Sequence, residues 1–353
     1  MRSPRLLALA LAPLAPLVVL AACGGGDEAA PTTVPETTIA ATTTTVEPTT
    51  TTVEETTTTP PPAEVYPLTG LPYTDPAAAA LPAVIVKVGN YDAHPQWNMA
   101  AADLVFEEII NDQVSRFAVV FQTNAPDMVG PVRSGRLQDV DLFGLLNRPI
   151  FAWSGGNGAV MAEIGNSDLI DLSQFVCQGT CFRSEVEKAP YNLFFDVAEI
   201  RTLDLPDAGT PPAQFTWRAE GEGPAGIANP GLDVQMDAYE VEWTWNAETG
   251  QYERAQNGNP DKDADGALVA FDNVVVLEMI YDPGISDSPD ARSLGEGEAW
   301  VLTGGNLVHG TWQRDDRLEP FTLLDDDGEV IALTPGRTFV MLPRDGDNVV
   351  PKS

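Results

Sequence analysis

A threonine- and proline-rich stretch between residues 31 and 62 divides this chain into an N-terminal leader and a C-terminal body. The stretch shows no apolar periodicity, and acidic residues such as Glu36 and Glu47 are scattered along it. A segment of this composition buries too little apolar surface to offset the entropy lost when its backbone is ordered. We therefore predict that residues 23–64 form a disordered tether and that the folded core is built from the residues after Glu64.

The leader, residues 1–22, has the pattern of a signal peptide. Arginines at positions 2 and 5 precede an apolar run that two prolines interrupt. A membrane span needs about 20 uninterrupted apolar residues, so the pattern favours an export signal over a membrane helix.

The end of the leader, Leu20-Ala21-Ala22-Cys23, resembles a bacterial lipobox. The resemblance implies that Cys23 is the lipidation site, carries a diacylglyceryl group with fatty acyl chains such as palmitate, and becomes the mature N-terminus. Two acyl chains give stable anchoring because each buried methylene contributes about 0.8 kcal/mol. This predicts a protein anchored at the extracytoplasmic face of the bacterial cell membrane. The alternative is a secreted protein in which Cys23 is incidental.

The net charge of the chain limits the classes of partner that it can bind. The chain has 52 acidic and 19 basic residues and a formal net charge of −33, so its surface repels nucleic acid. Two histidines and three cysteines are too few for the common zinc sites, and no cofactor-binding motif is present. We expect no nucleic acid and no cofactor. The expected partners are the membrane, through the lipid anchor, and a cell-wall component or an envelope protein.

The body mixes strand and helix patterns in its first part and is rich in strands in its second. Residues 83–88, 103–110, 116–121 and 150–153 are predicted strands, and the apolar spacing over 136–148 predicts a helix. Further strands are predicted at 239–246, 268–281, 299–302, 307–313 and 337–342. The predicted fold class is α+β. It comprises a mixed α/β domain (65–215), a linker (216–231) and a β-rich domain (232–350).

Many short segments of the body match one family in order. They are Pro67–Gly70, Pro82–Asn90, Pro95-Gln96, Ala102–Glu107, Arg116-Phe117, Gly130–Arg136, Trp153–Gly156, Pro190–Leu193, Asn273–Val276, Gly310–Arg314 and Pro335–Thr338. With them the chain resembles the YerB-type bacterial lipoproteins, an uncharacterised family with an N-terminal and a C-terminal homologous region. One departure is the acidic segment Asp261–Asp265, where the family often has a histidine. The resemblance implies an architecture and a location, and no activity.

The segment Gly130–Arg136 is the best candidate for ligand binding. Arg133 and Arg136 stand at a turn before the predicted helix, where two guanidinium groups can grip a carboxylate, a phosphate or a sugar acid. The turn Ser154, Gly155, Gly156 and Asn157 could offer backbone N–H groups to the same ligand. In the alternative interpretation, the two arginines form internal ion pairs with Asp139, Asp141 or Glu107.

Acidic residues suggest two further sites. Glu107, Glu108 and Asp112 could supply the two carboxylates of a glycoside hydrolase, but adjacent residues on a strand face opposite sides. The segment from Asp261 to Gly266, with Asp263 and Asp265, matches the start of a calcium loop, although no helices are predicted beside it. The alternatives are salt-bridged or solvated acids and an acidic hairpin loop.

Cys177 and Cys181 lie four residues apart in a chain predicted to be exported, and we predict a disulfide between them.

No nucleophile motif is present, and His94 and His309 lie in different regions. The tryptophans at 243, 245, 300 and 312 favour a β-core over a sugar platform. We favour a non-catalytic, lipid-anchored envelope protein that binds a cell-wall component or a protein partner. The alternative is a hydrolase or transferase acting on an envelope polymer. Two close carboxylates in a cleft would favour the enzyme, and an arginine-lined groove without them would favour binding.

Overall fold

The computed structural model describes residues 64–90, 93–285, 288–346 and 348–353. The predicted signal peptide, Cys23 and the tether up to residue 63 lie outside the described residues. The described part belongs to one compact unit, and none of its helices is long and apolar enough to cross a membrane.

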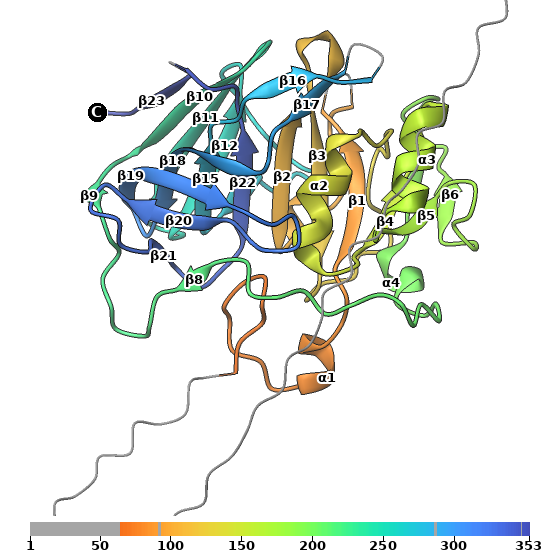
Figure 1. Ribbon diagram of the computed structural model, residues 1–353, viewed down its shortest axis with the longest axis horizontal. Helices are drawn as coiled ribbons and strands as arrows, with labels where there is room; N and C mark the ends of the chain where they lie inside the picture. The colour runs from red at the N-terminus through yellow and green to blue at the C-terminus, as the bar shows by residue number, and fades with distance from the viewer. Residues whose placement is uncertain (1–63, 91–92, 286–287, 347) are drawn as a thin grey trace, which may run out of the picture. The chain divides into compact units, whose positions relative to one another are not determined.

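An 11-stranded sheet runs through both sequence regions (Figure 1). Its strands, in spatial order, are β20 (Thr322–Asp325), β19 (Asn306–Arg314), β18 (Gly295–Thr303), β15 (Asn273–Leu277), β22 (Thr338–Leu342), β2 (Leu104–Ile109), β3 (Ser115–Phe121), β1 (Val84–Gly89), β4 (Ile150–Trp153) and β5 (Ile170–Ser173), with β9 (Ile227–Ala228) added to β19. β22 pairs in parallel with both β2 and β15. β1 and β2 are both antiparallel to β3, and β4 is parallel to both β1 and β5. β1, β2, β4 and β5 therefore run in one direction, and their carboxyl ends meet at one edge of the sheet.

A second, six-stranded sheet packs against one face of the first. Its strands are β13 (Asn259–Pro260), β12 (Gln251–Gln256), β11 (Tyr239–Asn246), β10 (Gly231–Met236) and β23 (Val349–Pro351), with β14 (Ala270–Phe271) paired to β12. Apolar side chains of both sheets form the core between them. At its centre the ring of Phe339 lies 5.0 Å from that of Trp243 and 5.3 Å from that of Phe271.

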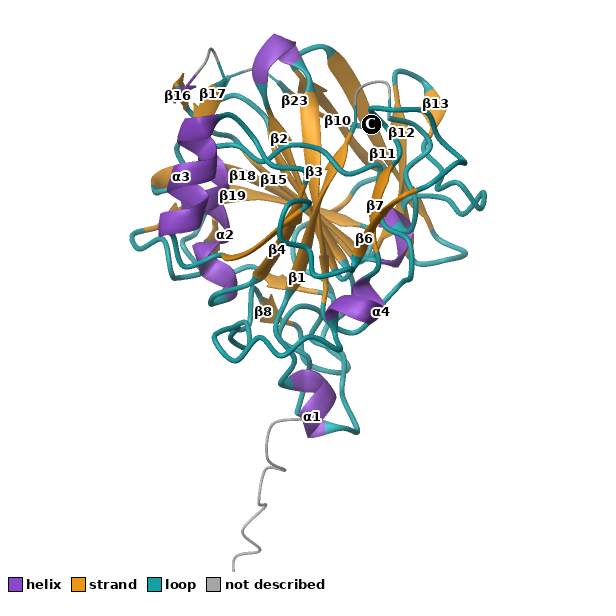
Figure 2. Ribbon diagram, turned by 90° about the vertical axis from the view of Figure 1, so that its right-hand side faces the viewer, coloured by secondary structure: helices purple, strands orange, loops and turns teal. Residues whose placement is uncertain are grey.

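Short helices cover the opposite face of the large sheet. They are α2 (Gln138–Phe143), the 3-10 turn η3 (Gly144–Leu146) and α3 (Gly158–Asn166). Phe143 packs against Phe106 and Phe151 of the sheet, with ring centroids 5.6 and 6.0 Å apart. Figure 2 shows α2 and α3 on one side of the fanned strands and β10–β12 on the other.

The remaining elements are short and peripheral. They are α1 (Pro76–Ala79), η1 (Met99–Ala101), η2 (Asn111–Gln113), α4 (Val197–Ile200), and three two-stranded sheets, β6 (Cys181–Arg183) with β7 (Leu193–Phe195), β8 (Thr216–Trp217) with β21 (Ala332–Leu333), and β16 (Tyr281–Pro283) with β17 (Pro289–Ala291).

The prediction of a β-rich C-terminal region agrees with this structure, whereas the mixed α/β character of the N-terminal region holds only in part. The predicted helix over 136–148 is shortened to α2 and η3, because Asn147 and Arg148 adopt positive φ angles of 56° and 58°. The predicted strand over 268–281 is wrong as one element. It is divided at Asp272, because β14 joins the small sheet and β15 the large one. The predicted linker contains β8 and β9, which pair with β21 and β19.

Candidate functional site

A cavity of about 420 Å³ lies at the carboxyl ends of β4 and β5. Ligands of open sheets with parallel strands commonly bind at this edge. The residues that line it include Arg136 and the whole turn Ser154, Gly155, Gly156 and Asn157. The structure thus brings together five of the six residues that the sequence predicted for ligand binding.

The turn after β4 lines this cavity and contains backbone N–H donors. The Ser154 N–H donates to the carbonyl of Arg133, but the N–H groups of Gly155 and Gly156 have no acceptor among the described residues. Gly155 has a φ of +92°, and an added Cβ atom would lie 2.8 Å from the ring of Phe175. A glycine is therefore needed at position 155 for the backbone to approach the cavity wall so closely. The Asn157 side chain accepts from Ala159 and Val160 and so begins α3.

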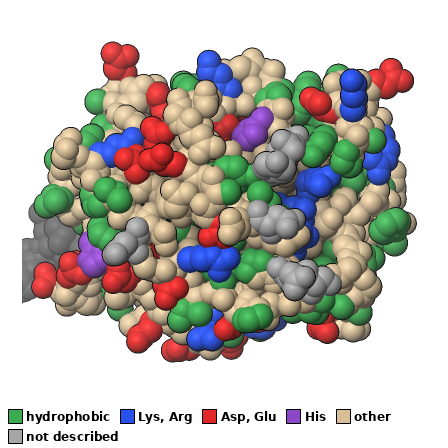
Figure 3. Space-filling view, turned by 90° about the horizontal axis from the view of Figure 1, so that it is seen from above, with side chains coloured by type: hydrophobic (Ala, Val, Ile, Leu, Met, Phe, Trp, Pro, Cys, Tyr) green, Lys and Arg blue, Asp and Glu red, His purple; other side chains and the backbone are tan. Residues whose placement is uncertain are grey.

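The sixth predicted residue, Arg133, lines an adjoining cavity of about 440 Å³. Asn111 and Arg136 line both cavities, so the two spaces are neighbours that meet at these side chains. We call the pair the arginine groove. Figure 3 looks onto this end of the sheet, where blue side chains gather to the right of the centre.

Three arginines of the groove lie close together. Arg116, which is 8% exposed, donates from Nη1 to the Ser134 carbonyl at 2.7 Å, and the Nη1 of Arg136 lies 3.5 Å from the same oxygen. Burial, together with the charges of Arg136 and Arg133, lowers the pKa of Arg116 to about 9. With this pKa Arg116 remains protonated at neutral pH, and the charges of Glu108 and Asp139 partly oppose those of the two arginines. No carboxylate lies within ion-pair distance of Arg116 or Arg133 among the described residues.

Arg133 reaches across the end of β1. Its guanidinium carbon lies 5.1 Å from the centre of the Tyr191 ring, an arrangement that allows cation–π attraction. A Cβ atom at Gly89 would lie 2.8 Å from the Cγ of Arg133, so the glycine leaves room for this path. The carboxylates named in the alternative interpretation have other partners. Glu107 pairs with Arg254, Asp139 with Lys87, and Asp141 with Arg317.

Glu107 and Glu108 are neighbours on β2 and face opposite sides of the sheet, as their adjacency predicts. On the helix side, Lys87 pairs with Glu108 and, at 2.7 Å, with Asp139, and all three side chains are 0% exposed. Burial and the neighbouring Asp139 raise the pKa of Glu108 to about 7. These acids do not form a hydrolytic pair, because none of the described residues lining the groove is Asp or Glu.

On the other side of the sheet, Glu107 joins a buried network with the C-terminal region. The Nη2 of Arg254 donates to Glu107 Oε2 at 2.9 Å, and its Nη1 pairs with Asp261. Glu107 also accepts from Ser115 at 2.6 Å and from Asn90 at 3.1 Å. Arg254 therefore holds β12 against β2 and the loop that begins at Asp261.

The calcium hypothesis finds no support in this loop. Asp261 faces Arg254, the carboxylate of Asp263 accepts from the N–H groups of Met99 and Ala100, and Asp265 accepts from Ala267. Burial raises the pKa of Asp263 to about 6. Among the described residues no group of three or more His, Cys, Asp or Glu side chains is arranged to hold a metal ion.

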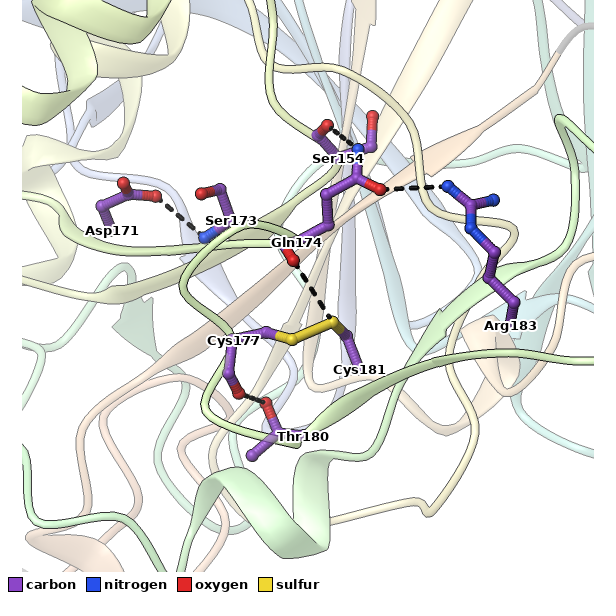
Figure 4. Close-up of a disulfide and its surroundings, with 8 residues drawn as sticks. All are labelled: Ser154, Asp171, Ser173, Gln174, Cys177, Thr180, Cys181 and Arg183. Atoms are coloured by element: carbon purple, nitrogen blue, oxygen red, sulfur yellow. Dashed lines mark hydrogen bonds between the residues drawn. A yellow bond between two sulfur atoms is a disulfide. The ribbon is translucent and has the colours of Figure 1, made fainter.

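Cys177 and Cys181 are joined by a disulfide in the structure (Figure 4). The bond closes a short loop directly after Gln174 and Phe175, which form one wall of the first cavity. Gln174 donates to the Ser154 carbonyl and accepts from Arg183 at 3.0 Å. The bridged loop thus supports the cavity wall next to the turn 154–157.

The other aromatic and histidine candidates lie apart from the groove. Trp243 and Trp312 are buried in the core, and Trp300 packs on His309 with ring centroids 4.3 Å apart. His94 lies near Asp261, and burial lowers its pKa.

Sequence reasoning did not place Arg116, Tyr191, Asn111 or Phe175 at the site. The sequence does contain one indication for Arg116, because it is a charged residue near the start of a strand that is otherwise mostly apolar. Asn111 begins the short turn η2, and Tyr191 and Phe175 lie in loops. The strand pairing that brings these three residues together joins segments that are distant in the sequence.

Two family regions match the chain. Residues 68–210 match the N-terminal domain, and residues 232–340 the C-terminal domain, of a protein family of unknown function, DUF3048. A curated relative, "Putative lipoprotein YerB" of Bacillus subtilis (strain 168), is 27% identical over 302 residues, which span 80% of this chain and 86% of the relative. The crystal structure of YerB protein from Bacillus subtilis has a TM-score of 0.71 at 23% identity, covering 82% of this chain and 99% of that one.

The fold and these matches define a protein built from an N-terminal and a C-terminal homologous region that share one sheet. The chain belongs to the family of YerB-type lipoproteins, as its sequence motifs indicated.

Proposed function

We propose that this protein is a lipid-anchored, extracytoplasmic binding protein whose arginine groove accepts an anionic component of the cell envelope. The observation that carries the proposal is the charge of the groove. Arg116 and Arg133 face it with no carboxylate partner among the described residues, in a chain of net charge −33. Positive side chains that have no carboxylate partner among the described residues, in so acidic a protein, favour an anionic ligand.

Two further observations support binding rather than hydrolysis. The described lining of the groove contains no acid that could protonate or attack a glycosidic bond. The strongly shifted carboxyl group nearby, Glu108, is 0% exposed and paired with Lys87. The anchor is supported by the lipobox pattern at Cys23 and by the likeness to a relative named as a lipoprotein.

Cys23→Ser tests the anchor. We expect the variant to be released into the medium or to keep its signal peptide, because serine cannot accept the thioether-linked diacylglyceryl group. Cell fractionation and the mass of the mature protein would show either result. The double variant Cys177→Ser/Cys181→Ser is the matched control and should remain in the membrane fraction. A Cys23→Ser protein that is processed normally and stays in the membrane would refute the lipobox.

Arg133→Ala tests the groove. A charge-assisted hydrogen bond contributes about 1.5–3 kcal/mol, so we expect the variant to bind inorganic tripolyphosphate at least tenfold more weakly than the wild type. Isothermal titration of the purified full-length protein would measure this. The fold should persist, because the Arg133 side chain is only partly buried and makes no ion pair with a described residue.

Arg292→Ala is the control for this titration. Arg292 pairs with Asp282 at 2.9 Å at an exposed site and lines neither cavity of the groove. Its affinity for tripolyphosphate should match the wild type. The proposal fails if the wild type does not bind the polyanion, or if Arg133→Ala and Arg292→Ala bind it equally well.

A further inference from the structure

The arginine groove consists of two cavities with separate sets of donors. The first has the N–H groups of Gly155 and Gly156, and the second has the guanidinium groups of Arg116 and Arg133. Arg136 and Asn111 stand where the cavities meet, and the Nη2 of Arg136 donates to Asn111 Oδ1 at 2.7 Å. A ligand with a single anionic group would engage only one of the two sets.

The donors reach the groove from different elements of the fold. Arg116 comes from the start of β3, Arg133 from the turn before α2, and the glycine N–H groups from the loop after β4. A planar carboxylate presents its two oxygens in one plane, whereas a phosphate presents oxygens in several directions. In the second cavity the guanidinium groups of Arg116 and Arg133 come from two different elements, an arrangement that suits a phosphate better than a carboxylate.

Each cavity also contains an aromatic ring beside its donors. Phe175 lines the first cavity and is 70% exposed, and Tyr191 lines the second beside Arg133. The exposed ring of Phe175 and the partly exposed ring of Tyr191 offer apolar surface to the carbon skeleton of a bound molecule. Each of the two neighbouring cavities therefore combines a ring with anion donors, which matches a ligand that has both carbon units and anionic groups.

Resting on the proposed function, we infer that the ligand is a phosphate-bearing glycan or polyol with at least two phosphate groups joined by a carbon unit. One phosphate occupies the first cavity, against Gly155 and Gly156, and the next occupies the second, against Arg116 and Arg133. Arg136 lies between them and contacts the linking unit or either phosphate.

The test compares matched small probes on the full-length protein. Fructose 1,6-bisphosphate carries two phosphates on one sugar, and fructose 6-phosphate carries one. Adipate carries two carboxylates at the ends of a carbon chain. By isothermal titration we expect the bisphosphate to bind at least tenfold more tightly than the monophosphate and than adipate.

Arg133→Ala should reduce the advantage of the bisphosphate over the monophosphate to less than threefold, because the second phosphate then keeps only Arg116 of its two guanidinium donors. Arg292→Ala should keep the full ratio. Equal binding of the bisphosphate and the monophosphate by the wild type would overturn the two-phosphate inference, and equal binding of adipate would overturn the choice of phosphate. In both results the groove still binds anions, so the proposed function survives. Failure of all three probes and of tripolyphosphate would overturn both.

Discussion

Arg254→Ala should destabilise the protein by about 3–5 kcal/mol, because it leaves two carboxylates buried without their cation. The Arg254 side chain is 0% exposed, as is Glu107, and Asp261 is 3% exposed. The guanidinium carbon also lies 5.3 Å from the ring centre of Phe117 and 5.6 Å from that of Phe339, so the truncation opens a cavity in the core between the sheets. Urea unfolding followed by tryptophan fluorescence would measure the loss.

The same substitution at Arg292 provides the comparison. The Arg292–Asp282 pair is about half exposed on both sides, and exposed ion pairs contribute about 0–1 kcal/mol. Arg292→Ala should therefore unfold close to the wild-type midpoint. Similar losses for the two variants would contradict the assignment of Arg254 as the buried link between β12 and β2.

Lys87→Met should also cost about 3–5 kcal/mol at pH 8, because it removes the only cation paired with Glu108 and Asp139 among the described residues. The loss should depend on pH in a defined direction. Burial raises the pKa of Glu108 from 4.5 to about 7, so between these values the folded state holds a proton that the unfolded state has released. The contribution of Glu108 to stability therefore falls as the pH rises through this window.

Without Lys87 the pKa of Glu108 moves further upward, so the deficit of Lys87→Met should be smaller at pH 5 than at pH 8. Urea unfolding at the two pH values would show the difference. The double variant Lys87→Met/Glu108→Gln should recover part of the stability at pH 8, because one buried charge is gone. Lys352→Met, which removes the cation of a partly exposed pair with Asp233 at 3.2 Å, is the control and should cost less than about 1 kcal/mol. A deficit that does not change with pH would contradict this account of the Lys87 network.

The strands were largely predictable, because a strand that is buried on one or both faces leaves a local pattern. The run at 83–88 became β1, and the alternation that starts at Tyr239 became β11. The division at Asp272 was not predictable. It depends on the partners that β14 and β15 find, and those partners lie far away in the sequence.

The candidate site was half predictable for the same reason. Arg133 and Arg136 were predictable from their spacing before a predicted helix, and the glycine turn was predictable from its place directly after a predicted strand. Arg116 is brought to them by the register of β3, in which it stands opposite Glu108 on one side and Gly89 on the other. Cross-strand register is set by the whole sheet and leaves no trace within a short window of sequence.

The place of β22 in the large sheet has a consequence for the order of assembly. Residues 338–342 are synthesised long after β2, yet they lie near the middle of the sheet, between β2 and β15. Until they arrive, β2 presents an unpaired edge of the kind that invites association with other chains. Parallel pairing over more than 200 residues of sequence also makes for slow folding. The edge of β2 therefore stays open to other strands until residues 338–342 have been made and have paired with it.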